Sequence, residues 1–130
     1  MSRINRQASG AVVAVLLLGA GVFLPRLGAS RDSVREIHIT ARGMAFHVDG
    51  VVGMNPPLRL AAREQVRLTF RNDDRGIVHD LSIPEWGVRT GKVEWGGEQS
   101  VLIDVPDAGA VAYQCTPHSA MMSGRILITR

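Results

Sequence analysis

The only cysteine of this 130-residue chain lies in a short segment that also contains a histidine and two methionines. These residues are Cys115, His118, Met121 and Met122, and a second histidine, His79, lies 36 positions before the cysteine. One thiolate, two imidazoles and a thioether are the donors of a mononuclear blue copper site, in which a methionine binds weakly along the axis. Zinc also binds cysteine and histidine, but its sites seldom use a thioether. The donor set therefore predicts one copper ion per chain, against the simpler alternative of a buried structural cysteine beside core methionines.

The segments that lead into these donors carry a recognisable pattern. Strand-like residues at 57–60 and 66–73 precede His79, and a Pro-Asp-Ala-Gly turn precedes Cys115, which begins a Cys-Thr-Pro-His motif. This pattern resembles the cupredoxins, the family that includes plastocyanin, pseudoazurin, amicyanin and azurin. The resemblance implies a Greek-key β-sandwich and a type 1 copper site with the ligands His79, Cys115, His118 and one methionine.

Two adjacent methionines compete for the axial position. Met121 gives the His-x2-Met spacing of amicyanin, and Met122 gives the His-x3-Met spacing of azurin. In the cupredoxins that the chain resembles, the axial methionine usually stands two residues before the glycine that opens the last strand. Here that glycine is Gly124, so the resemblance favours Met122, with Met121 as the alternative.

The remaining histidines and two further methionines lie apart from the cysteine. His38 and His47 fall in strand-like segments with no sulfur neighbour, so we expect them to be solvated or sheet-face residues. Met44 and Met54 are expected to be packing or loop residues, although Met54 precedes Asn-Pro-Pro and is able to approach the copper end of the domain.

Two residues next to ligands are expected to support the site. Asp80 follows His79 where the family commonly has asparagine, whose side chain ties this loop to the residue after the cysteine. Asp80 is therefore expected to accept a hydrogen bond from the Thr116 hydroxyl, and its charge would favour Cu(II) and lower the potential. The alternative, a solvated loop carboxylate, stays open.

The resemblance also implies that the edge of His118 reaches the surface and serves as the electron port. Pro117, Ala120 and Met121 would give that edge an apolar surround. A small apolar contact suits transient docking of a redox partner, whereas scattered surface hydrophobic residues are the alternative.

Short alternating segments predict an all-β sandwich of seven to eight strands. Apolar and polar residues alternate as in strands with one buried face, and Gly, Pro, Asn and Asp clusters separate the segments. The segments are residues 36–40, 46–48, 58–60, 66–70, 80–83, 101–105, 111–113 and 125–129. Helix is expected to be minimal, with one turn between Trp86 and Trp95.

Residues 1–30 are expected to be a separate signal peptide or membrane anchor. Arg3 and Arg6 precede an apolar run at residues 8–25, and small residues follow it. The run is close to the minimum length for spanning a bilayer, so cleavage near Ala29 and retention as an anchor both stay open. Residues 31–130 would then form one copper-binding domain in the periplasm or another extracytoplasmic space.

The charge of this domain gives no sign of nucleic-acid binding. Three of the 15 basic residues lie in the leader, so 12 basic residues face 12 acidic ones beyond residue 30. There is no basic stripe with interleaved aromatic residues. The single cysteine excludes an intramolecular disulfide, and we expect a monomer.

The sequence therefore predicts a one-electron carrier with redox-protein partners and not an enzyme, because the four-ligand site leaves no open position for a substrate. A copper chaperone or storage protein and a subunit of a larger redox complex are the alternatives. The sequence leaves the partners and the potential open.

Overall fold

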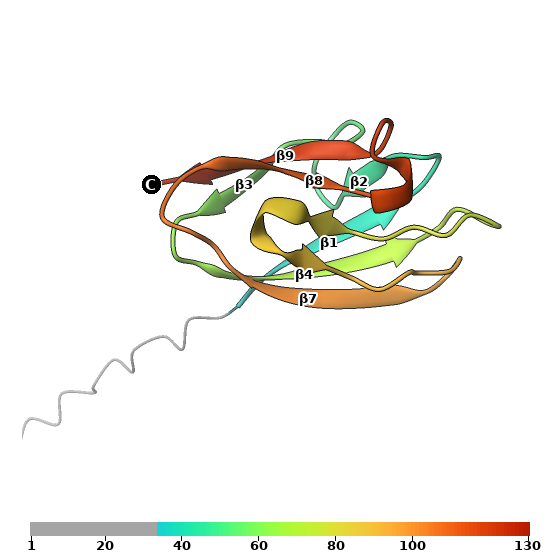
Figure 1. Ribbon diagram of the computed structural model, residues 1–130, viewed down its shortest axis with the longest axis horizontal. Helices are drawn as coiled ribbons and strands as arrows, with labels where there is room; N and C mark the ends of the chain where they lie inside the picture. Colours follow the sequence, from blue (N-terminus) through green and yellow to red (C-terminus); the bar gives the residue numbers. More distant parts are fainter. Residues whose placement is uncertain (1–33) are drawn as a thin grey trace, which may run out of the picture. The chain divides into compact units, whose positions relative to one another are not determined.

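A computed structural model describes residues 34–130 as a β-sandwich (Figure 1). The predicted leader at residues 1–30 and the next three residues, 31–33, lie outside the described residues. Within residues 34–130, no helix is long and apolar enough to cross a membrane.

The described residues form nine strands and two single-turn 3-10 helices. The strands are β1 (Arg35–Ala41), β2 (Phe46–Val48), β3 (Leu58–Ala61), β4 (Gln65–Asn72), β5 (Ser82–Ile83), β6 (Val88–Arg89), β7 (Glu98–Asp104), β8 (Ala110–Gln114) and β9 (Ser123–Thr129), and the helices are η1 (Pro84–Trp86) and η2 (Thr116–His118). Seven to eight strands were expected. The additional strand is β6, which, like β5, has only two residues and is too short to show an alternating pattern.

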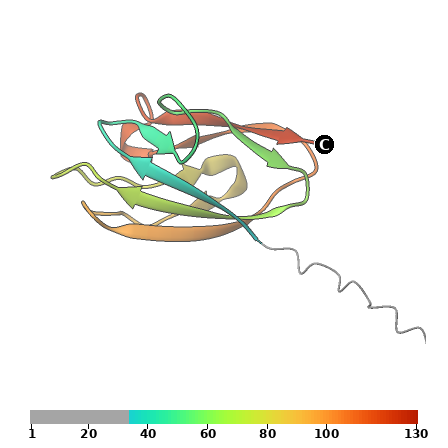
Figure 2. The same cartoon turned by 180° about the vertical axis from the view of Figure 1, so that it is seen from behind.

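The strands form two sheets that face each other (Figures 1 and 2). One sheet has the order β2-β1-β4-β7, and the other has the order β3-β9-β8-β5-β6. Each sheet contains one parallel pair, β1 with β4 and β3 with β9, and the remaining pairs are antiparallel. The all-β sandwich predicted from the alternating segments is confirmed.

The core lies between the sheets because the apolar residues of each strand point to the same face. β4 illustrates the alternation, since Val66, Leu68 and Phe70 are fully buried while Arg67 is exposed. The Phe46 ring packs against Phe70 at a centroid distance of 5.9 Å and against Tyr113 of the other sheet at 5.3 Å.

The strand directions bring several loops to one end of the sandwich, which we call the loop pole. It comprises the connections β1–β2 (42–45), β2–β3 (49–57), β4–β5 (73–81), β6–β7 (90–97) and β8–β9 (115–122). β1 and β4 run in parallel and both end at this pole, while β9 and β3 both begin there. Segments far apart in sequence therefore meet at the loop pole, and it contains all the predicted ligands.

Candidate metal centre

The connection between β8 and β9 positions Cys115 and His118. The Cys115 N–H donates to the Met122 carbonyl (3.0 Å) across the base of the connection, and the His118 N–H donates to the Cys115 carbonyl (3.1 Å). Pro117 lies in the single turn of η2, where its missing N–H is not needed. The tight turn folds His118 back towards Cys115, the residue that follows β8.

His79 comes from the connection between β4 and β5. It lies outside the named strands but forms an antiparallel bridge with Val93, in which each backbone N–H donates to the other residue's carbonyl (3.2 and 2.8 Å). Its side chain is fully buried. The two bridge bonds therefore fix the backbone of His79 to the β6–β7 connection.

The structure brings His79, Cys115 and His118 together. The Cys115 Sγ lies 3.5 Å from Nδ1 of His79 and 3.5 Å from Nδ1 of His118, and the three potential ligand atoms lie within 4.8 Å of one another. Nitrogen and sulfur ligands that bind one metal at about 2.0 to 2.3 Å are about 3.5 to 4 Å apart in a trigonal plane. The chemistry and spacing of the three donors thus fit a single copper ion.

Burial shapes the chemistry of the thiol. Cys115 is fully buried, and burial is the main reason why its pKa is raised above the ordinary value. A metal that binds the sulfur as thiolate must therefore displace a proton from it.

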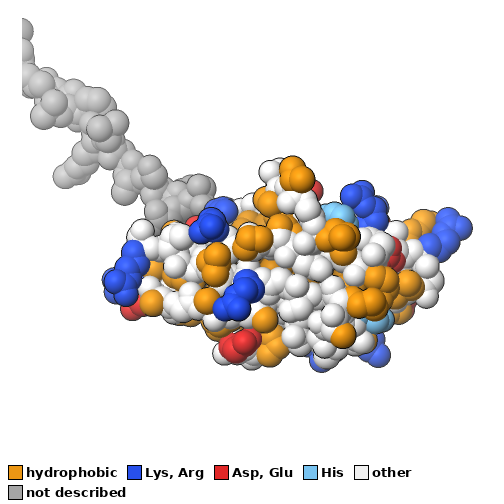
Figure 3. All heavy atoms as spheres, turned by 90° about the horizontal axis from the view of Figure 1, so that it is seen from above, with side chains coloured by type: hydrophobic (Ala, Val, Ile, Leu, Met, Phe, Trp, Pro, Cys, Tyr) orange, Lys and Arg blue, Asp and Glu red, His pale blue; other side chains and the backbone are white. Residues whose placement is uncertain are grey.

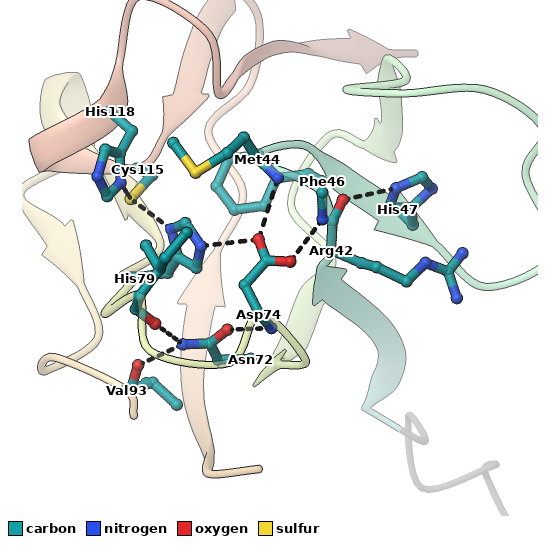
Figure 4. A network of polar contacts seen from close by, with 12 residues as sticks. Arg42, Met44, Phe46, His47, Asn72, Asp74, His79, Val93, Cys115 and His118 are labelled. Atoms are coloured by element: carbon teal, nitrogen blue, oxygen red, sulfur yellow. Dashed lines mark hydrogen bonds and ion pairs between the residues drawn. The ribbon is translucent and has the colours of Figure 1, made fainter. Parts of the chain in front are cut away.

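The two candidate axial residues have opposite environments. Met122 is fully buried, and its N–H donates to the His118 carbonyl (2.9 Å), whereas Met121 is 57% exposed. Burial at the base of the ligand loop favours Met122, in line with the spacing to Gly124. Met44 is a third thioether nearby, since its half-buried side chain extends from the β1–β2 turn towards the ligand group (Figure 4).

Asp80 contacts Thr116, but not in the way expected from the sequence. The Thr116 backbone N–H donates to Asp80 Oδ1 (2.5 Å), while the Thr116 hydroxyl donates to Ser82 Oγ (3.3 Å). The other oxygen of Asp80 pairs with the Arg89 guanidinium at 2.8 Å. Asp80 is thus a buried carboxylate paired with Arg89, and the effect of its charge on the potential stays a prediction.

The structure adds a residue that the sequence analysis missed. Asp74 Oδ2 lies 3.0 Å from Nε2 of His79, the ring nitrogen that faces away from Cys115 (Figure 4). Asp74 is five residues before the histidine on an irregular loop, so no periodic pattern pointed to it. His38 and His47 lie on β1 and β2 and are not part of the ligand group.

Comparisons with known proteins identify the fold. No protein-family model matches the sequence, and no curated protein matches it. Auracyanin A, a blue copper protein from the green thermophilic photosynthetic bacterium Chloroflexus aurantiacus, matches with a TM-score of 0.60 and 17% identity, over 75% of this chain and 100% of that one. Rusticyanin from Thiobacillus ferrooxidans matches with a TM-score of 0.57 and 24% identity, over 75% and 79% of the two chains. A chain of a heme-copper terminal oxidase dimer matches with a TM-score of 0.62 and 19% identity, over 76% and 66%.

Proposed function

We propose that this chain, which has the fold of the cupredoxins, is a type 1 copper protein that carries single electrons outside the cytoplasm. The observation that carries the proposal is the grouping of His79, Cys115 and His118 within 4.8 Å. Met122 would be the axial ligand. When bound, copper would supply a one-electron Cu(II)/Cu(I) couple.

The role of the chain's own residues would be to hold the ligands still. The bridge with Val93 holds His79, and the hydrogen bond from Cys115 to Met122 closes the ligand loop. A cage that changes little between two oxidation states keeps the reorganisation barrier to electron transfer low. Three buried residues, His79, Cys115 and Met122, would shield the site from water.

The surface around His118 suits a transient partner. His118 is half-buried, and Pro117, Ala120 and Met121 beside it are exposed. Figure 3 shows hydrophobic side chains gathered at one end of the face that it draws. A groove whose walls include Lys92 and Glu94 also reaches His118. We propose that redox partners dock here and that the protein has no catalytic activity of its own.

The spectrum of the copper-loaded protein tests this proposal. Overlap of the Cys115 sulfur with the half-filled copper orbital should give an intense blue or green band with Cu(II). Cys115→Ser should abolish the band while leaving the fold intact, because the side chains are similar in size. A colourless Cu(II) complex of the intact protein would exclude a type 1 site.

Copper delivery is the second candidate function, because the ligand group lies at a loop end of the domain. A carrier should exchange electrons rapidly between its two forms and keep its copper through repeated oxidation and reduction against a moderate chelator. A chaperone or storage protein should instead release Cu(I) readily to a competing apo-protein. Slow self-exchange together with ready release would favour that second function.

The setting of the domain also belongs to the proposal. Residues 1–30 would direct the chain to the periplasm or a comparable space, either as a signal peptide cleaved near Ala29 or as an anchor. The match to an oxidase chain shows a shared fold and is compatible with a subunit of a larger redox complex. Size-exclusion chromatography after membrane and soluble fractions are separated would distinguish a free monomer from an anchored subunit.

A further inference from the structure

The Asp74 carboxylate lies within hydrogen-bond distance of three nitrogen atoms at the loop pole. Its Oδ1 accepts the Gly43 N–H (2.6 Å), and its Oδ2 accepts the Met44 N–H (3.0 Å) and lies 3.0 Å from Nε2 of His79. Figure 4 shows the carboxylate between the β1–β2 turn and the His79 ring. The carboxylate therefore joins a candidate ligand to a turn about 30 residues earlier in the chain.

The β1–β2 turn is shaped to present these two donors. Gly43 and Met44 both have positive φ, 62° and 58°, which points consecutive N–H groups to one side of the turn. The left-handed conformation is costly for methionine, so the contacts with Asp74 offset a real strain.

Asp74 is itself held in place from behind. Its N–H donates to Asn72 Oδ1 (2.8 Å), and the buried Asn72 amide donates to the carbonyls of Ile77 (2.7 Å) and Val93 (2.8 Å). Val93 is also the bridge partner of His79. The same network thus holds both the backbone of the histidine and the carboxylate that faces its ring.

Asp74 and Asp80 have different ion-pair partners. Asp80 pairs with Arg89, whereas within residues 34–130 the ion-pair partner of Asp74 is His79 alone. The Asp74 side chain is only 12% exposed. The backbone N–H groups of Gly43 and Met44 both donate to its oxygens, and such donors favour the charged carboxylate.

We propose that Asp74 is a positioning residue that holds His79 by its Nε2–H, turns its Nδ1 lone pair towards Cys115, and biases the site towards Cu(II). This inference rests on the proposed copper site. A carboxylate behind a ligating histidine orients the ring and increases its basicity. A nearby negative charge stabilises Cu(II) more than Cu(I) and so lowers the reduction potential.

Asp74→Asn tests the charge, because asparagine has the same shape and keeps an acceptor oxygen. Loss of such a partner typically costs about tenfold or more in metal affinity. A tenfold loss confined to Cu(II) corresponds to a potential about 59 mV higher for a one-electron couple.

Asp73→Asn is the matched control, since it removes an equal charge from the adjacent residue, which pairs with Arg71 on the surface. A shift in Asp74→Asn no larger than in Asp73→Asn would overturn the proposal, because a purely structural role would leave the potential unchanged.

A second measurement needs neither a variant nor copper. Long-range ¹H–¹⁵N NMR of the copper-free protein, at a pH where the ring is neutral, should show His79 with its proton on Nε2. A proton on Nδ1 would overturn the inference even if Asp74→Asn failed to fold. Failure of the copper proposal is seen separately, as a wild-type protein without a thiolate-to-Cu(II) band.

Discussion

Met121 and Met122 show how one position along the chain changes the chemistry available to a side chain. Both lie in the connection that closes onto Cys115, and both N–H groups donate to the His118 carbonyl (2.9 Å each). The carbonyls differ, because that of Met122 accepts the Cys115 N–H (3.0 Å) and that of Met121 accepts from the Asn55 amide (2.9 Å). The Met122 side chain is buried in the core, while the Met121 side chain is exposed.

Replacement of each methionine by leucine separates their roles. Met122→Leu should raise the reduction potential and keep the intense band, because loss of a weak axial donor disfavours Cu(II) while Cys115 still binds. Met121→Leu should leave both nearly unchanged, because that side chain is exposed. Redox titration and visible spectra of the two variants would check this, and a larger effect from Met121→Leu would reverse the axial assignment.

The sequence revealed the candidate ligands but not all of the residues that hold them in place. The difference lies in how far apart the contacting residues are in the sequence. Cys115 and His118 are three residues apart, so their proximity follows from a single turn. Asp74 reaches His79 only because an irregular loop and a left-handed turn meet at the loop pole. Such contacts depend on tertiary structure and have no local pattern.

At the scale of elements, the pairing of β8 with β9 carries the ligand loop. Tyr113 lies directly opposite Gly124 in this pair. A Cβ atom at Gly124 would overlap the Tyr113 ring, so the glycine is needed for the close approach of that ring. The glycine used to align the axial methionine therefore has a packing role of its own.

Gly124→Ala should destabilise the domain by about 1 to 3 kcal/mol, the usual cost of overpacking a filled core. Gly91→Ala is the control, because the added methyl group there would meet only the flexible end of the Gln99 side chain. Urea unfolding of the copper-free proteins would measure both. Equal stability of Gly124→Ala and wild type would mean that the ring moves aside at little cost.

The alternating pattern predicted most strands well for a physical reason. β1, β4 and β9 each bury one face against the core, so burial alternates along much of their length. β5 covers only the second half of the predicted segment 80–83, and β6 was not predicted, because two residues cannot show a period. The helix η1 begins at Pro84, earlier than the predicted interval.

At the scale of the whole molecule, Tyr113 links the sheet interior to the loop pole. Its ring packs against Phe46 of the opposite sheet, and its buried hydroxyl donates to the Pro56 carbonyl (2.6 Å), 57 residues away in sequence. One side chain therefore joins both sheets and the β2–β3 connection. Ionisation of the Tyr113 hydroxyl should for this reason lower the stability of the whole sandwich and not of one loop alone.

This arrangement predicts a loss of stability at alkaline pH. Burial raises the pKa of Tyr113 in the folded protein above the value of about 10 expected for an unfolded chain. The folded state therefore retains this proton more tightly, and the resulting stability is complete below pH 10 and declines as the pH rises above it.

Cys115→Ser is the appropriate background for urea unfolding, because the raised pKa of the Cys115 thiol adds a similar dependence. In that background, Tyr113→Phe should lower the stability at neutral pH by about 0.5 to 1.5 kcal/mol, through loss of the hydrogen bond, and should flatten the decline above pH 10. An equally steep decline without the tyrosine hydroxyl would assign the alkaline sensitivity to other groups.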